Sequence, residues 1–194
     1  MGVMRLVALH MEDPLQARAI AKIEPHPLAS FGFSCVLMLG TLLGGLIAFA
    51  DSLTRPFPAV IAGGMLAFVI AWVPLTLSLH WISRLLGHRA DYGSLQTQVA
   101  LALWPLAILP AVGLVQFLSG WDSKILFCGA AAGVGVAALL FLRQGLMDNY
   151  GMKKPQANIA LIGASLLLAG LLGFILAGLT SGAVLWVIAS SILS

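Results

Sequence analysis

Residues 57–79 read FPAVIAGGMLAFVIAWVPLTLSL, a stretch of 23 residues without Asp, Glu, Lys or Arg. A hydrocarbon core of about 30 Å is crossed by roughly 20 apolar helical residues, each rising about 1.5 Å. The stretch therefore predicts a membrane-spanning helix. Four more uncharged stretches lie around it, at 31–50, 95–118, 125–142 and 159–193. Together they predict an all-α, polytopic membrane helix bundle.

The composition excludes several classes of protein. The 194 residues are 60% hydrophobic and only 9% charged, whereas a soluble domain has about 25% charged residues. A soluble enzyme, a nucleic-acid-binding domain and a disulfide-stapled secreted module are therefore not expected. The two cysteines, Cys35 and Cys128, fall inside the uncharged stretches, where a thiol acts as a small apolar filler.

Five transmembrane helices are predicted from these stretches, at 31–50, 57–79, 95–118, 125–142 and 157–179. The last uncharged stretch is too long for one ordinary span and short for two. We expect a break near Thr180-Ser181-Gly182, with a tail over 180–194. A sixth short or re-entrant helix over 183–193 is the alternative. The bundle then occupies 30–194, and a separate N-terminal segment occupies 1–29.

The basic residues predict the orientation of the bundle. Eight of the ten lie in alternate segments, namely Arg5, Arg18, Lys22, Arg84, Arg89, Arg143, Lys153 and Lys154. Only Arg55 and Lys124 fall on the other side. Because cytoplasmic segments carry the excess of Lys and Arg, we expect a cytoplasmic N-terminus and, with five spans, a C-terminus outside.

The N-terminal segment 1–29 contains a predicted amphipathic helix. Asp13 and Pro14 suit the N-cap and the first helical position. From there Leu15, Ala19 and Ile23 fall on one face of a helix. We expect this helix to lie in the cytoplasmic headgroup region as a surface anchor. A docking helix for a partner protein is the alternative.

Pairs of glycines four residues apart mark three of the predicted helices. Two glycines at this spacing share a helix face and permit close backbone approach. Such faces pack either inside the bundle or against another subunit, and the sequence leaves both open. The pairs are Gly40 and Gly44, Gly129 and Gly133, and Gly178 and Gly182.

Polar and kinked positions cluster on the predicted third helix. Each proline removes a backbone donor and bends the helix, so the freed carbonyl needs another partner. Such a helix either lines a cavity or is held by polar contacts between helices. The candidate cavity-lining residues are Gln98, Gln116, Pro105 and Pro110.

Chemistry-bearing motifs are missing from the sequence. Apart from the two thiols, no ionisable group falls within the five predicted spans, although pumps and ion-coupled carriers place such groups there. There is no metal-binding His-Glu-x-x-His helix, phosphate loop or paired carboxylate set. His80 and His88 would lie about 12 Å apart on one helix, too far for one metal ion. We therefore expect no catalytic residue, metal or cofactor, and no enzyme.

Two segments resemble the Yip1 domain family of five-span membrane proteins. In that family an apolar helix ends in a glycine, a short loop follows, and the next helix contains a proline. Gly87 falls on the position of the glycine, Tyr92 on that of the aromatic residue after the loop, and Pro105 on that of the helix proline. The first matching segment contains His80-Trp81-Ile82-Ser83-Arg84-Leu85-Leu86-Gly87, Tyr92-Gly93-Ser94 and Ala102-Leu103-Trp104-Pro105. The second runs from Leu146 to Ala157, where Tyr150-Gly151-Met152-Lys153-Lys154-Pro155-Gln156-Ala157 is similar to the family's glycine, basic residues and alanine before the last span.

The resemblance implies an architecture more than an activity. Eukaryotic members bind Rab-type GTPases, but their Asp-Leu-Tyr-Gly-Pro segment is absent from this sequence. The Asp13-Pro14 pair before a short helix is similar to prokaryotic members, whose activity is not settled. The resemblance therefore implies a five-span bundle in a bacterial inner membrane.

Two functions fit these features. The first is a non-catalytic scaffold or accessory subunit of a larger membrane assembly, with a membrane-protein partner or a second copy and no nucleic acid. The alternative is a small carrier or channel-like protein for a neutral or lipid-like substrate. In either case the basic cytoplasmic residues set the topology or bind anionic lipid headgroups. The candidate headgroup contacts are Arg84, Arg89, Arg143, Lys153 and Lys154.

Overall fold

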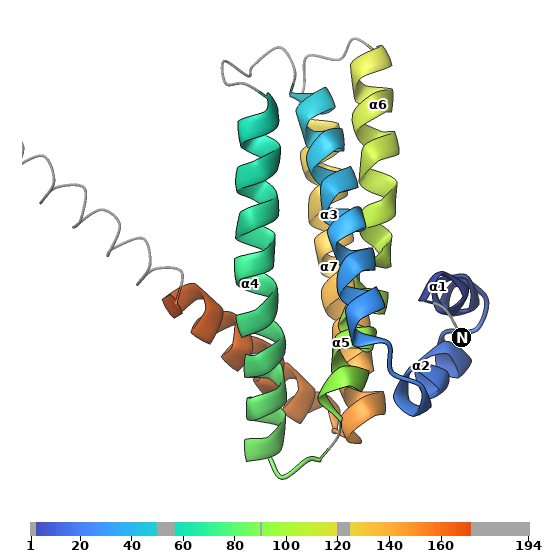
Figure 1. The fold of residues 1–194 in the computed structure, drawn as a ribbon, viewed down its shortest axis with the longest axis vertical. Helices are drawn as coiled ribbons and strands as arrows, with labels where there is room; N and C mark the ends of the chain where they lie inside the picture. The colour runs from blue at the N-terminus through green and yellow to red at the C-terminus, as the bar shows by residue number, and fades with distance from the viewer. Residues whose placement is uncertain (1–2, 50–56, 90, 120–124, 172–194) are drawn as a thin grey trace, which may run out of the picture.

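The computed structural model describes residues 3–49, 57–89, 91–119 and 125–171, and it shows a bundle of helices (Figure 1). Two short helices, α1 and α2, lie beside one end of the bundle, whereas α3, α4, α6 and α7 run along it. The element order is α1 Val3–Glu12, α2 Pro14–Ile23, α3 Pro27–Ala48, α4 Phe57–Leu85, α5 Tyr92–Ala102, the 3₁₀ helix η2 Trp104–Ile108, α6 Leu109–Ser119 and α7 Ile125–Tyr150. Residues 154–171 are also helical.

Four segments of the described chain are long and apolar enough to cross a membrane: Pro27–Ala48, Pro58–Leu85, Tyr92–Ser119 and Ile125–Tyr150. They correspond to the first four predicted spans, so the all-α membrane character is confirmed. The predicted fifth span over 157–179 begins in the helix at 154–171. The rest of that span and the predicted sixth segment lie outside the described residues, and both stay predictions.

The second and fourth spans extend further than the uncharged stretches. Helix α4 continues to Leu85 and α7 to Tyr150, six and eight residues beyond the predicted ends. In both cases a glycine with positive φ follows, Gly87 at 86° and Gly151 at 65°. Only glycine adopts this conformation without steric cost. Apolar character therefore ends before the helix does, and Arg143 and Asp148 lie on α7 rather than in a loop.

The third span is broken in the middle. Pro105 has no N–H to donate, and its ring would clash with the carbonyl four residues earlier in an α-helix. The backbone therefore forms the tighter 3₁₀ helix η2 at this point, in which the N–H of Leu106 donates to the carbonyl of Leu103 at 3.0 Å. Pro110 causes no second break, because it lies in the first turn of α6.

Helices α3 and α6 cross at their glycines. A Cβ added to Gly44 would lie 2.8 Å from the carbonyl oxygen of Leu109, and one added to Gly113 would overlap the Gly44 backbone. A Cβ at Gly40 would lie 3.2 Å from Cγ of Pro110. The first predicted glycine face therefore packs inside the bundle, and it lets two backbones approach more closely than any side chain would allow.

The N-terminal segment forms two helices, of which sequence patterning indicated only the second. Helix α2 begins at Pro14, and the Asp13 carboxylate accepts from the N–H groups of Leu15 and Gln16 at 3.1 Å each. Leu15 and Ile23, on the apolar face predicted to meet the headgroup region, are exposed. Ala21 packs with Leu6 of α1 and Leu101 of α5. A small side chain at this position allows the two short helices to lie against the bundle.

The main core lies between α4, α5, α7 and the helix at 154–171. Trp72, Leu79, Leu95 and Leu146 are buried in it. The buried residues that the helix at 154–171 contributes to this core are small, namely Ala157, Ala160 and Ala164, and the partly buried Leu161 packs against it. This helix consequently lies close against its neighbours, and it runs obliquely to the bundle axis in Figure 1.

Replacing Gly44 by alanine should loosen the α3–α6 crossing. Because the added methyl group would lie within 3 Å of backbone atoms that cannot yield, we expect a loss of about 1–3 kcal/mol. The unfolding midpoint of the purified protein in detergent should fall by several degrees. Gly129→Ala is the matched control, since no described atom lies within 4 Å of its added Cβ. Equal midpoints for the two variants would contradict the close crossing.

Candidate functional site

The ends of α4 and α7 meet at one end of the bundle, where α5 begins (Figure 1). We call this the basic end, because Arg84 lies in the last turn of α4 and Arg89 follows it. Tyr150 joins the two helix ends. Its hydroxyl lies 2.8 Å from Nδ1 of His80, and its carbonyl oxygen lies 3.0 Å from Nδ1 of His88. The C-termini of two membrane spans are thus fastened to each other.

Helix α5 is hydrogen-bonded to both of these spans. The hydroxyl of Tyr92 lies 2.8 Å from the hydroxyl of Thr76 in the middle of α4. The hydroxyl of Ser94 lies 2.9 Å from Oδ1 of Asn149 on α7. We refer to His80, His88, Tyr150, Tyr92, Thr76, Ser94 and Asn149 as the polar cluster.

The N-terminal segment is attached to α5 and α7 in this region by hydrogen bonds and an ion pair. Ser94 also lies 3.3 Å from the carbonyl oxygen of Ala21, and Thr97 accepts from the N–H of His26 at 3.0 Å. An ion pair adds a third link, from Arg18 of α2 to Asp148 of α7 at 2.6 Å. The Arg18 side chain is only 8% exposed. Its charge is therefore held in a largely dry site that depends on the partner carboxylate.

Helix α1 places a histidine against the bundle. The ring of His10 packs edge-on against Phe141, with 5.5 Å between the ring centres. Both of its nitrogens are buried and find no hydrogen-bond partner in the described part of the chain. Burial and the nearby charge of Arg18 lower the pKa of His10 to about 4, because neither favours the protonated ring. His10 is consequently neutral when α1 is docked at neutral pH.

These groups hold the helix ends and the segments beside them in place. The hydrogen bonds of the polar cluster run between different helices, and its two histidines both contact Tyr150. Within residues 3–49, 57–89, 91–119 and 125–171, no group of three or more His, Cys, Asp and Glu side chains is arranged to hold a metal ion. The hydrogen bonds of the polar cluster form a clamp between the ends of α4 and α7 and the start of α5.

The predicted glycine faces have different surroundings. Gly40 and Gly44 pack on α6, as described above. Gly129 and Gly133 of α7 have open space where a Cβ would lie, with no described atom within 4 Å. Their neighbours Cys128, Ala132 and Val136 are exposed. Gly178 and Gly182 lie outside the described residues.

Gln98 and Gln116 face protein. Gln116 donates to the carbonyl oxygen of Ala48 at 3.3 Å and accepts from the N–H of Phe127 at 2.9 Å. It therefore ties the end of α3 and the start of α7 to α6. Gln98 is buried against Gly145, and its amide finds no hydrogen-bond partner among the described residues. Pro105 and Pro110 were also predicted to line a cavity. Pro110 packs on α3, and Pro105 borders a cavity of about 260 Å³ beside Val134.

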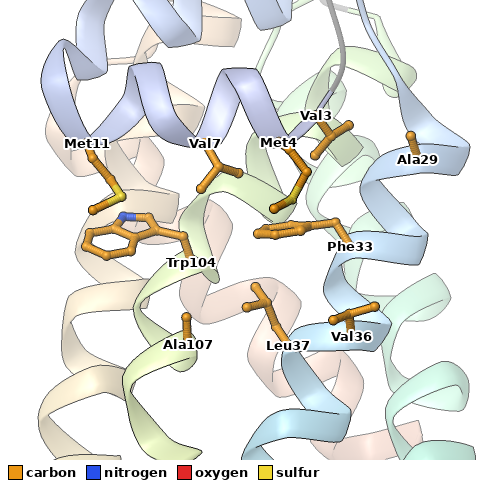
Figure 2. Close-up of a pocket in the computed structure, with 10 residues that line it drawn as sticks. All are labelled: Val3, Met4, Val7, Met11, Ala29, Phe33, Val36, Leu37, Trp104 and Ala107. Atoms are coloured by element: carbon orange, nitrogen blue, oxygen red, sulfur yellow. The ribbon is translucent and has the colours of Figure 1, made fainter. Parts of the chain in front are cut away.

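A large apolar crevice lies under α1 (Figure 2). Its volume is about 700 Å³, within the range of ligand-sized pockets. Met4, Val7 and Met11 of α1 point into it from one side, and Phe33 and Trp104 face them from the bundle. A smaller apolar cavity of about 220 Å³ lies between α4, α5 and α7 and is lined by residues that include Trp72, Val99 and Leu142.

The five candidate headgroup contacts lie near the basic end. Arg84 is in the last turn of α4, and Arg89 lies between α4 and α5. Arg143 lies on α7, and Lys153 and Lys154 are exposed at the start of the next helix. The chain therefore presents cations at the same end of the bundle as the polar cluster.

The helices, their apolar surfaces and the clamp at their ends define a polytopic helical membrane protein. The chain matches the Yip1 domain family over residues 13–192. Since the match covers most of its length, the chain belongs to this family, as the resemblance in the sequence indicated. Comparison with curated proteins and with solved structures finds no match.

Two parts of this region escaped sequence analysis. The Arg18–Asp148 pair joins residues 130 positions apart, and Asp148 lay beyond the predicted end of its helix. Helix α1 was predictable from the sequence, because Val3, Leu6 and His10 repeat at helical spacing, and all three are buried in the structure. The mixed polarity of the first residues hid it.

Asp148→Asn should destabilise the docked N-terminal segment. The change leaves the Arg18 charge buried without a counter-charge, which costs about 2–3 kcal/mol. We expect a lower unfolding midpoint and faster hydrogen exchange in α1 and α2. The double variant Arg18→Leu/Asp148→Leu removes both charges and should lose much less. A double variant as unstable as Asp148→Asn would show that the ion pair is not the cause.

Docking of α1 should weaken in acid. Undocked His10 takes up a proton near its ordinary pKa of 6.5, whereas the pKa of the docked residue is about 4. Docking stability is therefore complete above about pH 6.5 and falls by up to about 1.4 kcal/mol per pH unit between these values.

Hydrogen exchange of the α1 amides, corrected for its intrinsic pH dependence, measures this loss. His10→Phe keeps the ring contact with Phe141 and should remove the pH dependence. A pH dependence that persists in His10→Phe would assign the effect to another group.

Proposed function

We propose that this Yip1-family membrane protein is a non-catalytic scaffold or accessory subunit that assembles through the outer face of α7. The observation that carries the proposal is the contrast between its two described glycine faces. The one on α3 is closed by α6, whereas Gly129 and Gly133 on α7 are open among the described residues.

The composition of the open face supports association with another helix. Lipid tails are as apolar as any side chain, so helices associate in a membrane by close packing. Cys128, Gly129, Ala132 and Gly133 form a shallow strip that a second helix approaches closely. A flat strip of this kind makes better contact with a helix than with disordered lipid chains. The partner is another membrane protein or a second copy of this chain.

The basic end supports an orientation for this assembly. Arg84 and Arg89 lie at or just after the end of α4, and Lys153 and Lys154 lie just after the end of α7. Helices α1 and α2 lie beside this end of the bundle (Figure 1). By the excess of positive charge, this end faces the cytoplasm, and the host membrane is a bacterial inner membrane. In this orientation the exposed Leu15 and Ile23 of α2 meet the headgroup region of the bilayer.

A carrier for a neutral or lipid-like substrate is the second candidate. The apolar cavity between α4, α5 and α7 favours it, because Val99, Ala102 and Leu103 of the third span line one side of the cavity. Gln98, Gln116, Pro105 and Pro110 are not among the residues that line that cavity. The polar residues that motivated this function therefore do not line this cavity, and assembly remains the better supported proposal.

Gly133→Leu should disrupt the assembly without unfolding the protein. The leucine has room in the isolated chain, but it fills the strip that a partner helix would occupy. Gentle extraction from native membranes, followed by light scattering, should give a smaller particle for this variant than for the wild type. Gly63→Leu on α4 is the control, because Gly63 also has open space around it but lies on another helix.

A second copy and a different partner give different results. Oxidative cross-linking through exposed Cys128 should yield a covalent dimer for a second copy, and Cys128→Ser should abolish it. A particle mass equal to one chain, unchanged by Gly133→Leu, would contradict the assembly role.

A further inference from the structure

A second crevice, of about 540 Å³, lies between α7 and the helix at 154–171. Leu139 of α7 lines one side, and Leu161, Ile162 and Leu166 line the other. All but Leu161 are exposed, so the crevice opens toward the bilayer. Asn158 and Ser165 are its two polar residues. It is distinct from the outer face of α7 proposed for assembly, which lies nearer the other end of that helix.

Two cations flank the crevice toward the basic end. Arg143 follows Leu139 by one helical turn, and Lys154 precedes Asn158 by one turn, so each continues a lining face of its helix. Nε of Arg143 is buried and has no hydrogen-bond partner among the described residues. A buried guanidinium nitrogen without an acceptor is costly. Lys154 is exposed beside Lys153.

We propose that this crevice binds an anionic phospholipid. Its phosphate lies between Arg143 and Lys154, the Asn158 amide faces the ester region, and an acyl chain fills the apolar part of the crevice. Basic pockets between spans on the cytoplasmic side suit such headgroups. The order of groups along the helix, cationic, then amide, then apolar, matches the order of groups in the lipid.

The length of the crevice fits this occupant. Asn158 and Ala169 mark its two ends on this helix, and 11 helical residues span about 16 Å. Half of the hydrocarbon core measures about 15 Å, so the crevice is about as long as one acyl leaflet. A partner helix would fill the apolar part but would leave Arg143 without an acceptor.

The test uses the full chain, purified in detergent and mixed with equal amounts of phosphatidylglycerol and phosphatidylcholine that carry the same acyl chains. Native mass spectrometry measures the ratio of the two lipids bound. The wild type should favour phosphatidylglycerol, and Arg143→Gln/Lys154→Gln should reduce this preference by about fivefold for each charge removed. The control Arg5→Gln/Lys22→Gln removes two exposed charges from the N-terminal helices and should leave the ratio unchanged. Added inorganic phosphate should not displace the lipid.

The acyl chain is tested separately. Ser165 is exposed in the crevice, so Ser165→Trp fills it from the open side and should reduce binding of both lipids without changing their ratio. If Arg143→Gln does not fold, Lys154→Gln alone should lower the preference about fivefold.

Three results would overturn the site. The first is no lipid preference in the wild type, and the second is an equal effect of the control pair. The third is lipid binding that Ser165→Trp leaves unchanged. None of these results bears on the particle mass that tests the assembly role, so the two proposals fail separately.

Discussion

The structure depends on Tyr150, which joins the C-terminal ends of two membrane spans by its side chain and its carbonyl group. A helix end leaves carbonyl groups unpaired, and near a membrane boundary such groups need a partner. His88 reaches one of them, and His80 holds the ring. Because α5 and α2 hydrogen-bond to neighbouring residues, this contact also positions the start of the third span and the N-terminal helices.

Packing along the bundle follows a different rule from its clamped end. In lipid, helices gain little by hiding apolar surface from one another, so close fit decides which of them associate. The crossing of Gly44 and Gly113 uses this rule within the chain. We propose that the open strip around Gly133 offers the same close fit to a helix of another subunit. The crevice beyond Leu139 offers a looser fit, which suits a flexible acyl chain.

Much of this architecture was predictable from the sequence. Uncharged stretches locate four spans, and Asp13-Pro14 and Gly87 mark a helix start and a helix end. The charges of Arg143 and Asp148 led to a predicted helix end at 142 that was too early. Hydropathy indicates where the bilayer ends, whereas the backbone conformation at Gly151 decides where the helix ends. The Arg18–Asp148 pair is a product of tertiary packing between distant segments, and no local pattern encodes it. Whether a glycine face packs inside the bundle or stays exposed likewise depends on which helix the fold places beside it.

The 3₁₀ turn at Pro105 also changes the direction in which the third span faces. Gln98 and Gln116 are separated by 18 residues, which is five full turns of an α-helix, so an unbroken span would carry both on one side. A 3₁₀ segment advances about 120° per residue instead of about 100°. Over the five residues of η2 this adds roughly a quarter turn. The two amides therefore do not form a continuous polar track. Gln98 lies against Gly145 toward the C-terminal end of α7, whereas Gln116 lies between the end of α3 and the start of α7.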